Sequence, residues 1–180
     1  MKKIYIVLTN TGTFVSNLIR KHTGDTYNHV SISLKRDLSE MYSFGRLNPY
    51  IFFYGGFVIE SPKTGTFKRF HKTVARVYEL EVEDETFASI EKEIAVFVVE
   101  KKRFGYNYRG ILKARKNVYY QKDKNRFYCS QFVHYLLVKS NVISANRFDG
   151  VVTPEKLSSI EGLHLCYEGL LREYEEKSAD

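Results

Sequence analysis

Two segments with different hydrophobic periods constrain the fold of this chain most. In residues 30–35, apolar side chains alternate with polar ones, which is the pattern of a half-buried strand. In residues 129–139, apolar side chains recur at the spacing of a buried helix: Phe132, Val133, Leu136 and Leu137. Elements of these two kinds must bury their apolar faces against other elements, so we expect an α+β fold.

The rest of the chain predicts further strands and helices. We expect strands at residues 4–8, 57–60, 66–70, 74–82 and 163–167, and helices at 13–24, 84–102 and 108–113, with one more helix beginning at Thr153–Pro154. Residues 36–56 are rich in aromatic and turn-forming residues and are predicted to be an irregular excursion with a short strand. The whole chain, residues 1–180, is long enough for one domain, in which an antiparallel sheet or partial barrel packs against the helix at 129–139.

Cys129 stands where this predicted helix begins. A thiol at a helix N-terminus lies at the positive end of the helix dipole, next to backbone N–H groups that have no partner within the helix. Both features favour a thiolate, which is a strong nucleophile, and the same N–H groups can bind the oxyanion of a tetrahedral intermediate. Cys129 is therefore the candidate nucleophile.

His29, next to the alternating strand, is the candidate base. By parity it shares a face with Ser31, opposite the apolar residues, and a side chain on the open face of a strand can line a cleft. A catalytic imidazole needs a third group to fix its tautomer, and two candidates for it are Glu60, at the end of a predicted strand, and Ser31. We favour Glu60, because a carboxylate stabilises an imidazolium better than a hydroxyl does.

Three blocks of the sequence resemble the motifs of a known superfamily: YNHVSISL, GGFVIESPKTGTF and FYCSQFVHYLL. They are similar to the His, acidic and Cys motifs of the circularly permuted branch of the NlpC-type papain-like superfamily, which includes YiiX-like proteins and relatives of lecithin:retinol acyltransferase. In that branch the His strand precedes the Cys helix, as it does here, whereas papain-type enzymes place Cys before His. The resemblance extends from Ile4 to about Leu157. It implies a permuted papain-like fold with Cys129 as nucleophile, His29 as base and Glu60 as the third residue.

The same resemblance extends the candidate site to a pocket. Tyr128 matches an aromatic residue often found before the nucleophile and is expected to shape the pocket, in which we also place Ser130, Asn28 and Ser31. The chain departs from simpler members of the family in the aromatic insertion at residues 36–56 and in the lack of a secretion signal. Both departures argue against a cell-wall substrate.

These residues predict a cysteine-dependent hydrolase that attacks an amide or isopeptide carbonyl and forms an acyl-enzyme. Two alternatives stay open: a lipid acyltransferase or thioesterase of the same fold, and a non-catalytic module that binds an anionic ligand. The formal charge of +7 favours anionic partners, including a phospholipid surface. Nucleic acid is not expected as a partner, because the aromatic residues form no RNP or OB-like signature.

No cofactor or metal is expected. There is no Gly-rich phosphate loop, and His22, His71 and His164 show no metal-ligand spacing. The first apolar run ends at Thr9, which is too short for a signal peptide, and no segment reaches the ~18 apolar residues of a membrane span. We therefore expect a cytoplasmic protein with free thiols, in which Cys166 is a core residue.

Overall fold

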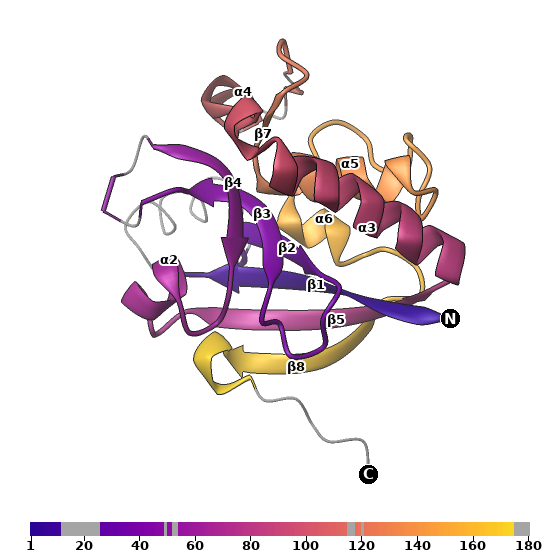
Figure 1. Ribbon diagram of the computed structural model, residues 1–180, viewed down its shortest axis with the longest axis horizontal. Helices are drawn as coiled ribbons and strands as arrows, with labels where there is room; N and C mark the ends of the chain where they lie inside the picture. The colour runs from indigo at the N-terminus through magenta and orange to yellow at the C-terminus, as the bar shows by residue number, and fades with distance from the viewer. Residues whose placement is uncertain (12–25, 49, 52–53, 115–117, 120, 175–180) are drawn as a thin grey trace.

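The computed structural model describes residues 1–11, 26–48, 50–51, 54–114, 118–119 and 121–174 of the chain (Figure 1). Its strands form one open sheet in the order β7 (Arg126–Phe127), β6 (Gly105–Tyr106), β4 (Gly55–Glu60), β3 (Met41–Arg46), β2 (His29–Ser33), β1 (Lys2–Asn10), β5 (Val74–Val82) and β8 (His164–Leu170). Neighbouring strands are antiparallel except β6 and β7, which are parallel. The predicted α+β class and the mostly antiparallel sheet are confirmed.

The helices described in this part of the chain are α2 (Gly65–Arg69), α3 (Asp84–Val99), α4 (Tyr108–Ala114), α5 (Cys129–Lys139) and α6 (Pro154–Leu157). Two 3-10 helices, η1 (Lys101–Arg103) and η2 (Leu171–Glu173), follow α3 and β8. Figure 1 shows α3, α5 and α6 grouped together, with α2 on the opposite side of the molecule. Since α5 contacts β2, β3 and α3, it packs on the middle of the sheet.

β1 lies inside the sheet and is buried on both of its faces. Ile4 and Ile6 belong to the larger core, together with the apolar side chains of α3 and α5. Tyr5 and Val7 belong to a smaller cluster on the other face, where Phe67 of α2 also lies. Burial on both faces explains why the first strand is a continuous apolar run and does not alternate.

Aromatic rings fill the larger core between the sheet and its helices. Phe132 of α5 is fully buried, and its ring centroid lies 4.9 Å from that of Phe97 in α3 and 5.3 Å from that of Phe44 in β3. Aromatic pairs at such separations contribute about 0.5–1.5 kcal/mol each beyond the burial of their surface. This cluster therefore holds the helix that begins at Cys129 firmly against the strands.

The structure confirms some predicted elements and corrects others. α5 and β5 have the predicted bounds. The predicted strand at 66–70 is wrong, because Lys68 and Phe70 donate helical backbone hydrogen bonds to the carbonyls of Thr64 and Thr66. Phe67 is the one buried residue of α2, and a segment with one buried side chain has too little pattern to distinguish a helix from a strand.

The prediction that Cys166 is a core residue is also wrong. Cys166 is exposed because β8 is an edge strand, although its Sγ donates a hydrogen bond of 3.3 Å to the carbonyl of Val77. Smaller differences concern ends and turns: α3 ends at Val99 and gives way to η1, the expected turn after it contains β6, and the excursion at 36–56 contains the six-residue strand β3. The predicted helix at 13–24 lies outside the described residues.

We expect Phe132→Ala to lower the free energy of unfolding by about 3–5 kcal/mol, because it removes a buried ring and leaves a cavity. Val99→Ala is the control, since the Val99 side chain is 83% exposed; it should change the free energy by less than about 0.5 kcal/mol. Urea unfolding followed by circular dichroism measures both. Small, equal effects would contradict the position of Phe132 in the core.

Candidate active site

Three strands bring the candidate base and its carboxylate together. His29 is the first residue of β2 and Glu60 is the last residue of β4, and β3 lies between these two strands. Their side chains meet across β3, next to Gly45. A Cβ atom at Gly45 would lie 3.6 Å from Cε1 of His29 and 3.6 Å from Oε1 of Glu60. These are ordinary contact distances, so a methyl group fits at this position, whereas a larger side chain would press on the imidazole and the carboxylate.

Glu60 is the direct partner of His29. Its Oε2 lies 2.8 Å from Nε2 of His29, and the Glu60 side chain is only 9% exposed. Ser31 donates a hydrogen bond of 2.8 Å from Oγ to the same carboxylate oxygen, and this Oγ lies 3.3 Å from Nε2 of His29. Glu60 and Ser31 are the two candidates for the group that orients the imidazole. Both contribute to the hydrogen bonding: Glu60 binds the imidazole, and Ser31 binds Glu60.

The expected open face of β2 is present only at the start of the strand. Ser31 and Ser33 are fully buried, which corrects the prediction that this face is open along its length. The smaller core cluster, with Phe67 of α2, covers this side of the sheet. The side chain of His29 stays 17% exposed because it lies at the end of the strand.

α5 begins at Cys129, as predicted, and a set of hydrogen bonds fixes this start. The backbone N–H of Tyr128 donates to Oε1 of Gln131 at 3.2 Å, and Nδ2 of Asn107 donates to the same oxygen at 3.0 Å. Gln131 thereby ties the first turn of α5 to the residue that precedes α4. Cys129 is 4% exposed and stands at the first position of the helix, where backbone N–H groups have no helical partner.

Cys129 lies close enough to His29 to influence its imidazole. Side-chain hydrogen bonding with Cys129 and the charge of Cys129 are among the causes that raise the pKa of His29. Because Nε2 of the ring faces Glu60, Nδ1 is the nitrogen that is left to exchange a proton with the thiol. Cys129, His29 and Glu60 thus form one connected set of polar groups, which we call the triad.

The surroundings of His29 favour its protonated form. Burial lowers the pKa of His29. The charge of Glu60, side-chain hydrogen bonding with Cys129 and Glu60, and the charge of Cys129 outweigh burial and raise this pKa from an ordinary value of 6.5 to about 10. At neutral pH the imidazole is therefore positively charged. A positively charged group is thereby placed near Cys129.

The other predicted pocket residues lie around the starts of α5 and β2. Tyr128 is buried, and burial together with the charge of Cys129 raises the pKa of its hydroxyl. The Oγ of Ser130 donates a hydrogen bond of 2.8 Å to the carbonyl of Val152, so it holds the segment before α6. Asn28 is partly exposed at the entry to β2.

Tyr106 is a site residue that the sequence did not reveal. Burial raises the pKa of its hydroxyl, and the charges of Cys129, Tyr108 and Tyr128 raise it further, while Arg46 lowers it. Tyr106 thus lies within electrostatic reach of the thiol and stays a neutral donor. In the sequence it is one of several aromatic residues in a predicted turn, and no spacing distinguishes it from its neighbours.

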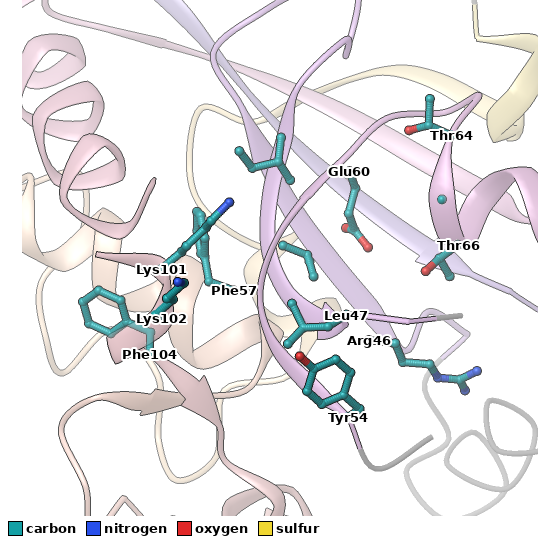
Figure 2. Close-up of a pocket in the computed structure, with 13 residues that line it drawn as sticks. Arg46, Leu47, Tyr54, Phe57, Glu60, Thr64, Thr66, Lys101, Lys102 and Phe104 are labelled. Atoms are coloured by element: carbon teal, nitrogen blue, oxygen red, sulfur yellow. The ribbon is translucent and has the colours of Figure 1, made fainter. Parts of the chain in front are cut away.

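A groove of about 680 Å³ lies beside Glu60 (Figure 2). Residues of β4, the start of α2 and η1 line it, and the figure shows the carboxylate of Glu60 directed into it. Neither Cys129 nor His29 is among its lining residues. The groove therefore meets the triad through Glu60.

Within the described ranges, no group of three or more His, Cys, Asp or Glu side chains is placed to hold a metal ion. None of the helices in those ranges is both long enough and apolar enough to cross a bilayer. A scan against protein-family models and a search of curated proteins each found no match. The function is therefore inferred from the residues and geometry of the site.

We expect Gly45→Ala to be tolerated and Gly45→Val to separate His29 from Glu60. An alanine Cβ would make ordinary contacts of 3.4–3.6 Å, whereas valine adds two methyl groups against the imidazole and the carboxylate. The pKa of His29, measured by NMR on the ring, should stay near the wild-type value in the alanine variant and fall in the valine variant. An unchanged pKa in Gly45→Val would contradict this role of the glycine.

We expect Glu60→Gln to lower the pKa of His29, because burial is then opposed by Cys129 alone. The raised pKa of His29 contributes stability that is fully present below about pH 6.5 and is lost as the pH rises toward about 10. Glu60→Gln should remove this contribution, whereas Glu161→Gln, at an exposed position, should not. NMR titration of the ring and urea unfolding at several pH values measure the two effects. A His29 midpoint that does not move in Glu60→Gln is the outcome that would refute the coupling.

Proposed function

We propose that this chain is a cysteine-dependent hydrolase that attacks an amide or isopeptide carbonyl through Cys129, His29 and Glu60. The observation that carries the proposal is the contact of 2.8 Å between Nε2 of His29 and Oε2 of Glu60, on a ring whose pKa Cys129 also raises. An imidazole held by a carboxylate, next to a thiol at a helix N-terminus, combines a nucleophile with its acid–base partner.

The proposed reaction begins with the thiolate of Cys129. It attacks the carbonyl carbon, a C–S bond forms, and the carbonyl oxygen becomes an oxyanion that the N–H groups at the start of α5 can bind. The imidazolium of His29 gives its proton to the leaving amine as the C–N bond breaks, which leaves an acyl-enzyme. Neutral His29 then takes a proton from a water molecule that attacks the thioester, and Cys129 departs as a thiolate.

Glu60 supports this cycle without changing its own protonation. Its carboxylate orients the ring through Nε2 and stabilises the imidazolium, as the acidic member of a triad does. Ser31 donates to the same oxygen and thereby fixes the carboxylate. This arrangement gives a role to a buried serine in β2 and a nearly buried glutamate in β4, the strands on either side of β3.

We expect iodoacetamide to alkylate Cys129 at least about tenfold faster than Cys166 near pH 6.5, although Cys166 is the more exposed thiol. The proposed nucleophile lies near the imidazolium of His29 and at a helix N-terminus, whereas partial burial of the sulfur and the charge of Glu79 raise the pKa of Cys166. Mass spectrometry of the labelled peptides gives both rates.

His29→Gln is the matched control for this experiment, and it should slow the labelling of Cys129 while leaving that of Cys166 unchanged. Cys129→Ala should abolish turnover and keep the fold. The acyl donor can be identified with peptidyl, fatty-acyl ester and thioester probes, from the mass of the adduct on Cys129. Slow, equal labelling of both thiols would favour a non-catalytic module that binds an anionic ligand.

A further inference from the structure

The hairpin formed by β3, β4 and the loop between them exposes large apolar side chains. Five of these side chains, each 46–75% exposed, lie on it: Leu47, Tyr50, Ile51, Tyr54 and Ile59. Single exposed apolar residues are ordinary on protein surfaces, but a group of them on one hairpin indicates an interaction site. We call these five residues the apolar patch.

Hydrogen bonds hold the described part of this loop in shape. Leu47 donates a backbone hydrogen bond of 2.9 Å to the carbonyl of Tyr54, and the backbone N–H of Tyr50 donates to Oδ1 of Asn48 at 2.8 Å. The guanidinium of Arg69 in α2 lies 3.9 Å from the centroid of the Tyr50 ring. The loop therefore presents its apolar side chains from a defined position next to a cation.

Basic side chains line the groove beside the same hairpin. Lys101 and Lys102 of η1, together with Arg46, line it along with three members of the apolar patch (Figure 2). Glu60 is the one carboxylate among the described lining residues, and His29 already binds it. None of the ion pairs between described residues involves Lys101 or Lys102. Apolar and positively charged groups are thus combined on one surface.

We propose that the apolar patch and the two lysines form a docking surface for an anionic phospholipid membrane. Tyrosines are favoured at the boundary between headgroups and acyl chains, and leucine and isoleucine side chains enter the apolar layer. Lysines near the membrane surface are attracted to anionic headgroups. The formal charge of +7 acts in the same direction over a longer range.

The composition of the patch favours a membrane over nucleic acid. Leu47, Ile51 and Ile59 offer neither stacking nor hydrogen bonds to bases, whereas single-strand binding depends on aromatic stacking along a basic track. Docking at this surface would place the Glu60 end of the triad at the membrane. The inference does not depend on catalysis, because none of the docking residues belongs to the triad.

The test is sedimentation of the full chain with phosphatidylcholine vesicles, prepared with and without phosphatidylglycerol. The protein should bind the anionic vesicles and not the neutral ones, and binding should weaken as the salt concentration rises. Lys101→Gln with Lys102→Gln should lower the partition coefficient by about fivefold for each lysine. Ile51→Ser with Tyr54→Ser should lower it by at least about tenfold.

Matched controls remove the same groups elsewhere on the surface. Leu165→Ser changes an apolar residue of similar exposure on β8, at the far edge of the sheet, and Lys92→Gln with Lys139→Gln removes two charges outside the groove. Both controls should bind vesicles nearly as well as the wild type.

Three outcomes would overturn the proposal: no binding of the wild type to anionic vesicles, equal losses in the controls, or a dimer in solution that Ile51→Ser with Tyr54→Ser dissociates. The last outcome would assign the patch to a second copy of this chain. Cys129→Ala should bind vesicles as the wild type does, so vesicle binding tests the docking surface alone and thiol labelling tests the hydrolase alone.

Discussion

The contact between His29 and Glu60 depends on the register of three strands and on a small residue at Gly45, where a Cβ atom would already touch both side chains. Side chains alternate between the two faces of a sheet, so a shift of β4 by one residue would turn Glu60 to the other face and leave His29 without its carboxylate. A buried charge without a partner is strongly unfavourable, which means that pairing and register support each other. The imidazole, the carboxylate and Ser31 form a polar cluster that joins β2 to β4 across β3.

The position of the thiol depends on the core in a similar way. Phe132 follows Cys129 by three residues in α5 and packs against rings from α3 and β3. The hydrogen bonds of Gln131 with Tyr128 and Asn107 fix where the helix starts. Packing of one face of α5 therefore sets the place of its first residue, Cys129.

Successive side chains of β4 point to opposite faces of the sheet, so this strand contributes to two different surfaces. Glu60 turns toward β2 and joins the triad, whereas Ile59, the residue before it, stays exposed beside the groove. The proposed membrane surface and the proposed catalytic site thus share one strand. Such an arrangement would let an amphiphilic substrate meet the site at the boundary of a bilayer, where its apolar part stays in the lipid.

The sequence by itself determined the elements that depend on local pattern and the types of chemistry available. Hydrophobic periods predicted the bounds of α5 and β5, and the residue types at positions 129, 29 and 60 made these residues the candidate nucleophile, base and third polar group. Periodicity reflects neighbours along the chain, so it is strongest for long elements with one buried face. It was too weak for α2, in which a single side chain is buried.

Only the tertiary structure decided the features that arise between distant segments. It buried Ser31 beneath a second core cluster, left Cys166 exposed on an edge strand, and brought Tyr106 near the thiol. It also placed Gly45 next to His29 and Glu60, where only a small side chain fits. These outcomes follow from which strands pair and which face each helix covers, and those choices depend on the burial of the whole chain rather than on any local stretch of it.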